Sequence, residues 1–306
     1  MILELRRRPT LEAVTDSDAV VGRVLAAMGG PAFAAELAAV ETIEDDRVGE
    51  EVCDRVLAVA AGRADGGPGA PGAHPREVWD DFHWLVHVVA RNWPRHFVDV
   101  VAADPVLRES TSVLGALGGV DGPAAAGILI EAVQIRRAGH NFARWAAVGS
   151  LVRLGHPSLP DLLVALVRDR DGLVRFSAVQ AAISYGDARV LAWLRRMAEG
   201  ERTPPGTREY AWDAIEAITI REGRSDVAPA PHGRRLVQVA RPTGSRNGVI
   251  QAVPYRHDTV ERGALLAVTR TGSRNRRALA PVDGLIVSPR PVVGQRPPEI
   301  LFWLRI

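Results

Sequence analysis

The chain has 306 residues, 47% of them apolar and 24% charged, with a formal net charge of +2, as expected for a globular protein that can bury a hydrophobic core. It has no run of 18 or more apolar residues and no secretory signal pattern, and its single cysteine, Cys53, excludes an internal disulfide framework and fits a reducing cytoplasm. All 38 basic residues are arginine, which excludes a Schiff base, a P-loop lysine or a lysine-attached cofactor and indicates a bacterial genome rich in G and C.

Residues 1–62 predict a small helical region. The segment TDSD (15–18) can cap the first helix, because Asp and Ser side chains accept hydrogen bonds from the free backbone N–H groups of a helix start. Helical spacing of apolar residues indicates helices over 19–28, 32–43 and 48–61. The next segment, 63–75, is dense in Gly and Pro and predicts a flexible linker.

Residues 76–222 contain an internal repeat. The segment RWAAVGSLVRLGHPSLPDLLVAL (144–166) aligns with RFSAVQAAISYGDARVLAWLRRM (175–197) at an offset of 31 residues, so that Arg144 falls on Arg175. Weaker matches before and after these copies give spacings of 31–37 residues and predict four or so helix pairs. A period of this size is typical of a helical solenoid, in which each pair buries its apolar face only by stacking on its neighbours.

The phrase DGLVRFSAVQAAI (171–183) and its copy at 144–152 resemble the HEAT family, in particular its short, PBS-lyase-like bacterial form. We expect Asp171 to cap a helix and Arg175 to reach an acid on the next repeat. The resemblance implies an α-helical solenoid that binds macromolecules along its surface. Members of the family include scaffolds, chromophore lyase subunits and, in a related helical-repeat type, DNA-base glycosylases.

A second linker is predicted at 223–233, followed by a small all-β region at 234–306. Its expected strands are 235–240, 248–253, 264–269, 284–288 and 300–306. This region holds 13 arginines against four acids, a net charge of +9, whereas the preceding part holds 25 arginines against 32 acids, a net charge of −7. The asymmetry predicts that the β region either binds an anionic partner or docks on the acidic body of its own chain.

The all-β region is similar to biotinyl and lipoyl carrier domains. The phrases HDTVERGALL (257–266) and APVDGLI (280–286) occupy the places of two family motifs, and Gly263 and Gly284 are expected to supply turns with positive φ. The hairpin that would carry the modified lysine reads TGSRNRR (271–277), and arginine cannot be biotinylated or lipoylated by this chemistry. The resemblance therefore implies a barrel-sandwich docking module without a swinging arm.

One helix offers a weak metal site. His83 and His87 are four residues apart with Asp80 one turn earlier, which places three possible ligands on one helix face. The phrase HWLVH lacks the glutamate of the HExxH motif, and a half-buried polar stripe explains the pattern more simply. No nucleophile elbow or phosphate-binding loop occurs, so we expect neither catalysis nor a cofactor.

Two turns of the β region repeat the phrase Gly-Ser-Arg-Asn, and arginine forks suit phosphate or carboxylate. The sequence thus predicts a multidomain α + β protein, a HEAT-type solenoid with a small all-β domain, that acts as a cytoplasmic, non-catalytic adaptor for a protein partner. Nucleic-acid binding through the same turns, possibly repair-related, and a lyase-type subunit are the alternatives, and the oligomeric state stays open. The residues expected to bind a partner are Arg246, Arg274, Arg276, Arg277, Trp84, Arg144 and Arg175.

Overall fold

The computed structural model describes residues 16–62, 75–137, 139–224, 236–252, 259–288 and 300–306. A large part of both predicted linkers lies outside these residues. The chain divides into two compact units, Met1–Ala132 and Val133–Ile306, and the division falls within the predicted solenoid. In the part of the chain that the structure describes, no helix is both long and apolar enough to cross a bilayer.

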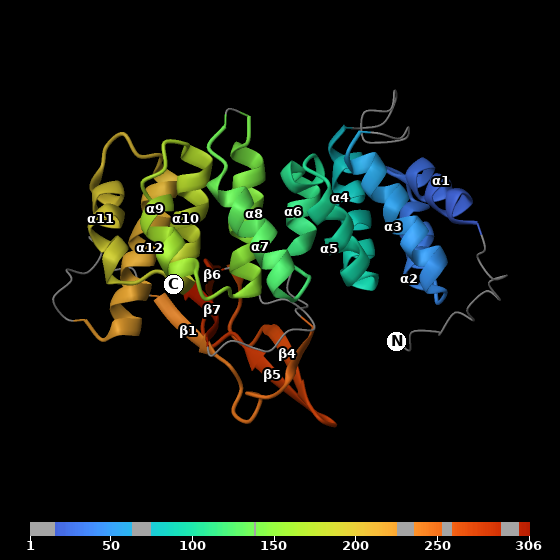
Figure 1. The fold of residues 1–306 in the computed structure, drawn as a ribbon. Helices are drawn as coiled ribbons and strands as arrows, with labels where there is room; N and C mark the ends of the chain where they lie inside the picture. The colour runs from blue at the N-terminus through green and yellow to red at the C-terminus, as the bar shows by residue number, and fades with distance from the viewer. Residues whose placement is uncertain (1–15, 63–74, 138, 225–235, 253–258, 289–299) are drawn as a thin grey trace. The chain divides into compact units, whose positions relative to one another are not determined.

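The first unit is built of helices (Figure 1). They are α1 (Ser17–Ala27), α2 (Phe33–Glu41), α3 (Asp46–Ala60), α4 (Pro75–Asn92), α5 (Pro94–Ala103), a short 3-10 helix η1 (Leu107–Glu109), α6 (Thr111–Leu117) and α7 (Pro123–Gln134), which runs into the second unit. Asp16 caps α1 as predicted, because its carboxylate accepts from the backbone N–H groups of Asp18 and Ala19. Helix α4 contacts α2, α3, α5 and α6 and forms the centre of the unit.

A glycine permits the closest helix contact in this unit. A Cβ atom on Gly49 of α3 would lie 2.1 Å from the indole of Trp93, which lies between α4 and α5 and is 8% exposed. The bare backbone at Gly49 therefore lets the largest side chain of the interface pack flat on α3. The helical spacing of the tryptophans in the sequence also predicts that Trp79 lies in the core. This prediction is wrong, because Trp79 of α4 is 53% exposed.

The second unit begins with stacked helices. They are α8 (Asn141–Leu154), α9 (Leu159–Leu166), α10 (Gly172–Tyr185), a 3-10 helix η2 (Ala188–Val190), α11 (Leu191–Glu199) and α12 (Pro205–Glu222). Helix α10 contacts α8, α9 and α12, so successive repeats lie side by side (Figure 1). The predicted cap is confirmed, since the Asp171 carboxylate accepts from the backbone N–H groups of Leu173 and Val174 at 2.9 and 3.0 Å.

An ion pair connects the two matched repeats near the start of their helices. The Arg144 guanidinium donates to both carboxylate oxygens of Asp169, at 3.1 and 2.5 Å, and to the Val133 carbonyl at 2.9 Å. Both side chains of the pair are only 5–6% exposed. Asp169 also accepts from the backbone N–H of Asp171, at 3.0 Å, so the buried carboxylate has several donors. Hydrogen bonds to Arg144 hold the pKa of Asp169 below its ordinary value despite its burial.

At the other end of the same helices, side chains of each repeat bond the final carbonyl groups of the preceding one. The Tyr185 hydroxyl donates to the Val152 carbonyl at 3.1 Å. One repeat further on, the Arg221 guanidinium donates to the carbonyls of Ile183, at 2.9 Å, and Gly186. The last carbonyls of a helix have no intrahelical donor, so these bonds satisfy them and fix the stacking of neighbouring repeats.

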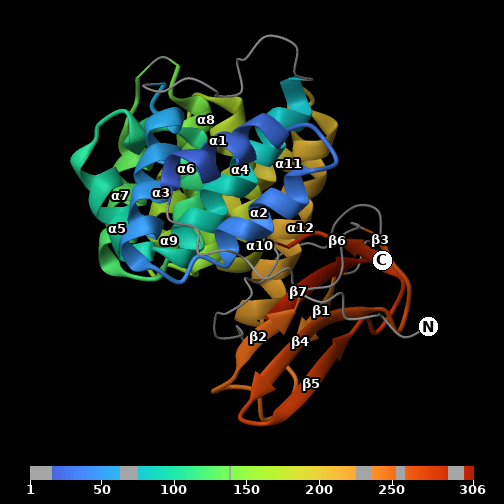
Figure 2. The same cartoon turned by 90° about the vertical axis from the view of Figure 1, so that its right-hand side faces the viewer.

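The β region forms two antiparallel sheets (Figure 2). One has the order β1-β7-β6-β3, with β1 (Leu236–Ala240), β3 (Thr259–Val260), β6 (Gly284–Ile286) and β7 (Ile300–Arg305). The other has the order β2-β4-β5, with β2 (Val249–Ala252), β4 (Leu265–Thr271) and β5 (Arg274–Leu279). The five predicted strands are present, and β3 and β5 are additional.

Inward-facing side chains of both sheets share one core, centred on Val260, Leu266, Phe302 and Leu304. Gly263 has the predicted positive φ, at +85°. The same expectation for Gly284 is wrong: this residue lies in β6 without positive φ, and a Cβ there would come 2.8 Å from the Arg305 carbonyl of β7. Close pairing of two strands, and no turn, therefore requires glycine at that position.

The β region contacts its own last helix through acidic side chains of α12. The Arg305 guanidinium of β7 pairs with Asp213, donates to Glu209 at 3.0 Å and lies over the Tyr210 ring, 5.6 Å from its centroid. The backbone N–H of Leu236 in β1 donates to a fourth α12 residue, Glu216, at 2.7 Å. Docking of the basic region on its own chain, one of the two expectations from the charge asymmetry, thus occurs at α12.

Candidate functional site

Four large aromatic side chains stand out from the helices. Trp79 and Trp84, on α4, are 53% and 63% exposed, and Phe142 and Trp145, on α8, are 65% and 39% exposed. Exposed apolar side chains are common singly, but neighbouring aromatic ones are typical of binding surfaces. We call Phe142 and Trp145 the α8 aromatic surface, because they are three positions apart and share one helix face.

The α8 aromatic surface has open space beside it. A Cβ added at Gly149, one turn after Trp145, would meet no atom within 4 Å. One repeat further on, Phe176 occupies the position that corresponds to Trp145, and it packs edge-to-face against Tyr210 with ring centroids 5.5 Å apart. An aromatic residue at this point of the repeat therefore contacts another ring where the next helix supplies one, and Trp145 is left 39% exposed.

Two arginines predicted to bind a partner lie within the repeat framework. Arg144 is 4% exposed and fully engaged with Asp169 and the Val133 carbonyl. The prediction that Arg175 reaches an acid on the next repeat is wrong. Its guanidinium donates instead to the carbonyls of Asp169 and Arg170, at 2.6 and 2.8 Å. Both arginines thus order the connection between α9 and α10, which is the physical reason for their recurrence in the sequence.

The predicted metal residues form a pair and no larger group. His83 and His87 lie with their Nε2 atoms 3.0 Å apart, and their rings meet edge to face. His83 packs closely on α6, because a Cβ at Gly115 would lie 2.7 Å from its ring. Asp80 is exposed on the same helix, and no group of three or more potential ligands occurs among the described residues. Trp84 lies beside His87, with ring centroids 6.3 Å apart.

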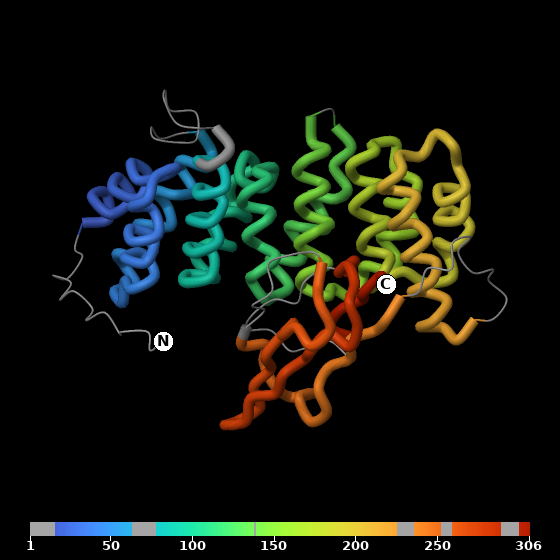
Figure 3. The backbone as a smooth tube through the Cα atoms, turned by 180° about the vertical axis from the view of Figure 1, so that it is seen from behind, coloured from blue at the N-terminus to red at the C-terminus, as the bar shows by residue number. Residues whose placement is uncertain are grey.

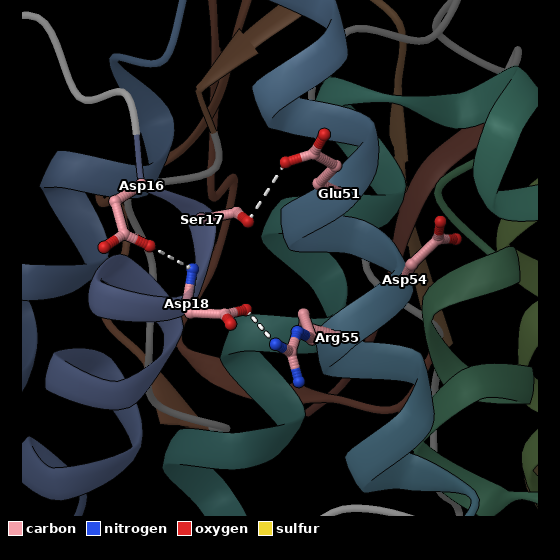
Figure 4. A pocket seen from close by; sticks show the side chains of 6 residues that line it. All are labelled: Asp16, Ser17, Asp18, Glu51, Asp54 and Arg55. Atoms are coloured by element: carbon pink, nitrogen blue, oxygen red, sulfur yellow. Dashed lines mark hydrogen bonds and ion pairs between the residues drawn. The ribbon is translucent and has the colours of Figure 1, made fainter.

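An acidic cleft of about 470 Å³ lies between α1 and α3 (Figure 4). Its carboxylates are engaged in local contacts. Asp16 caps α1, Asp18 pairs with Arg55, Glu51 accepts from Ser17 at 3.2 Å, and Asp54 contacts His96 at 2.7 Å; the lining residues are Asp16, Ser17, Asp18, Glu51, Asp54 and Arg55. The cleft is therefore a surface network that joins helices.

The two Gly-Ser-Arg-Asn turns of the β region lie next to each other. The Arg276 guanidinium packs against Gly244 of the first turn, where a Cβ would come within 2.9 Å of Nη2, and the Thr271 hydroxyl donates to the Gly244 carbonyl at 3.5 Å. Arg246, Arg274 and Arg277 are exposed, whereas Arg276 is half-buried. The structure thus brings together the four arginines that the sequence singles out in these turns.

Comparison with known proteins supports the helical assignment. Residues 133–214, which span α8 to the first half of α12, match the family model described as HEAT repeats. Together with the β region, they define a multidomain α + β fold, with HEAT-like helices and a small antiparallel all-β region in two sheets. The carrier-like character of the β region remains a prediction.

No curated protein matches the chain. Two crystal structures of engineered proteins from a structural genomics programme are similar to it, each at 15% sequence identity. The first covers 68% of this chain and 93% of its own with a TM-score of 0.37, and the second covers 68% and 88% with a TM-score of 0.34.

Sequence reasoning missed Phe142 as a surface residue and expected Trp145 in the core. Both lie in an apolar stretch whose residues are mostly buried, so composition alone hides them. The repeat itself holds a signal. Phe142 precedes the aligned segment, and at the offset of 31 residues it corresponds to Leu173, which is only half-buried.

Proposed function

We propose that this protein is a protein-interaction scaffold, which binds a partner through the α8 aromatic surface. The observation that carries the proposal is the exposure of Phe142 and Trp145 on a helix of the segment that matches HEAT repeats. HEAT-type helices commonly serve as protein-binding surfaces, and buried aromatic side chains supply much of the binding free energy in such interfaces.

The mechanism is surface recognition by a preformed helix face. α8 is held from both ends, by the Arg144–Asp169 pair and by the Tyr185 hydroxyl on the Val152 carbonyl, so the helix that carries the exposed rings is fixed before a partner arrives. A fixed surface loses little conformational entropy on binding, which favours affinity. The open space beside Gly149 leaves room for an apolar side chain of the partner next to the Trp145 ring.

The experiment is an affinity capture of the tagged full-length chain from extract of its native cell, run in parallel with and without nuclease. We expect a discrete protein to be retained by the wild type and lost, at least tenfold, by the double variant Phe142→Ser/Trp145→Ser, since two interface aromatics commonly contribute more than about 1.4 kcal/mol. Ile220→Ser, on α12, is the matched control, because Ile220 is also apolar and 43% exposed.

Two results would overturn the proposal. One is retention of the same proteins by the double variant and the wild type at equal levels, provided that circular dichroism shows both to be folded. The other is a captured species that disappears with nuclease treatment, which would make nucleic acid the bound macromolecule.

A further inference from the structure

The hairpin of β4 and β5 in the β region, whose backbone Figure 3 draws, is rich in arginine and separate in sequence from α8. Segments 241–252 and 265–279 hold six arginines and no acidic residue, which gives them a charge of +6. Arg270 and Arg277 share one face of the sheet, since Arg270 pairs with Asn275 two positions before Arg277. Among the described residues, Arg246, Arg270, Arg274 and Arg277 are exposed and have no ion pair.

Close backbone contacts fix this arginine-rich surface. A Cβ at Gly248 would lie 2.5 Å from the Arg270 carbonyl and 2.5 Å from the Thr271 hydroxyl, and Gly244 has a φ of +77° against the Arg276 guanidinium. The buried Ser245 hydroxyl donates to the Pro242 carbonyl at 2.6 Å, which closes the first turn on itself. These contacts therefore hold the backbone of the two turns at a defined position, so the turns need not reorder on binding.

The same hairpin offers a free strand edge. In the part of the chain that the structure describes, β5 pairs only with β4, so its other edge has unpaired backbone donors and acceptors. Side chains on β5 alternate, which places Arg277 and Leu279 on one face, and Leu279 is 49% exposed. An exposed backbone edge with alternating cationic and apolar side chains has the features of a site for an added peptide strand.

We propose that β5 binds an extended acidic segment of a partner protein, which adds as an antiparallel or parallel strand and pairs its carboxylates with Arg277 and Arg270, on one face of the sheet. The positive charge of the surface favours an anionic partner. The free strand edge and the exposed Leu279 favour a peptide, which can pair its backbone and contact an apolar side chain. Segments 241–252 and 265–279 contain no aromatic residue, so the stacking platforms of single-stranded nucleic-acid sites are missing there.

The test measures binding to the full-length protein by fluorescence anisotropy. The probes are a labelled ten-residue peptide of alternating Glu and Val, the same composition with two residues replaced by Pro, and a labelled DNA duplex. We expect the first peptide to bind, the Pro peptide to bind at least tenfold more weakly because it cannot pair along an edge, and the duplex to bind no better than the Pro peptide.

The variant Arg270→Gln/Arg277→Gln should weaken binding of the first peptide about tenfold, through loss of two charge-assisted contacts on one sheet face. Arg170→Gln/Arg202→Gln is the control with the same charge change at two exposed arginines of the helical part, outside the β region, and it should bind as the wild type does. Hydrogen exchange on the wild type adds a readout that needs no variant: the peptide should protect amides of β5.

Equal binding of the two peptides, or unprotected β5 amides at saturating peptide, would overturn strand addition. Tighter binding of the duplex would show that the hairpin is a nucleic-acid surface. The same loss in the control variant would show attraction by net charge alone. Because α8 takes no part, failure here leaves the proposed function to its own test.

Discussion

The buried pair of Arg144 and Asp169 gives a sharp prediction for Arg144→Met. The methionine keeps much of the volume of the side chain but leaves the Asp169 carboxylate 6% exposed and without its bidentate partner. Removing one member of such a pair costs about 3–5 kcal/mol, because the remaining charge is buried and uncompensated. Asp169 keeps the backbone N–H of Asp171 as a donor, at 3.0 Å, so we expect the lower end, about 3 kcal/mol.

The assay is thermal unfolding followed by circular dichroism, with the double variant Arg144→Met/Asp169→Leu completing a mutant cycle. For a unit of 150–250 residues, 1 kcal/mol shifts Tm by about 2–4 °C, so the single variant should lose roughly 6–12 °C. The double variant should recover most of this loss, because no charge is left buried. A loss of less than about 2 °C in the single variant, or an equal loss in the double, would refute the reasoning.

The same pair predicts the pH dependence. The pKa of Asp169 is below its ordinary value of 3.8, mainly because of the hydrogen bonds from Arg144. A lowered folded-state pKa contributes stability above the ordinary value, and this contribution is lost as the pH falls through the folded-state pKa. Acidification from pH 5 to pH 3 should therefore lower the Tm of the wild type more than that of the double variant.

Further predictions concern three other places in the fold. Burial, with Asp54 and Glu50 close by, raises the pKa of Cys53 to about 12, so Ellman's reagent at pH 8 should react slowly with the folded protein and fast in urea; equal rates would contradict the burial. Gly49→Ala should lower the free energy of unfolding by about 1–3 kcal/mol, because the added methyl group forces the Trp93 indole away from α3; the measurement is a lower Tm. An unchanged Tm would show that the indole moves freely. Arg305→Ala should speed hydrogen exchange in β1 and β7, because it frees the contact with α12; unchanged exchange there would mean that the contact does not stabilise the β region.

The helical part of the fold could be read from the sequence because its signals are local. Apolar periodicity, the Asp16 and Asp171 caps and the 31-residue repeat each act within one helix pair, and the structure confirms them. The direction of exposure at Trp79 and Trp145 could not be read, because it depends on which face the next helix covers. That is a tertiary property that a period of 3.6 residues does not contain.

Strand β5 shows a second limit. Its sequence, RNRRAL, lacks the β-branched and aromatic residues that indicate strands, and it pairs because the turn Gly272-Ser273 folds it back on β4. The four arginines of the two Gly-Ser-Arg-Asn turns could be named from the sequence as candidates. Their proximity could not, since it depends on contacts of Gly244 and Gly248 with residues 22 to 32 positions away.

The acidic contacts of α12 determine where the array of repeats stops. Shifted back by 33 residues, Glu209, Asp213 and Glu216 correspond to Phe176, Gln180 and Ile183 of α10, on the side where Phe176 packs against α12. The β region therefore takes up the neighbour position that a further repeat would occupy, with three carboxylates where α10 has no charged residue. A duplicated repeat unit could therefore not be added directly after α12, because an apolar helix stacked there would bury three carboxylates.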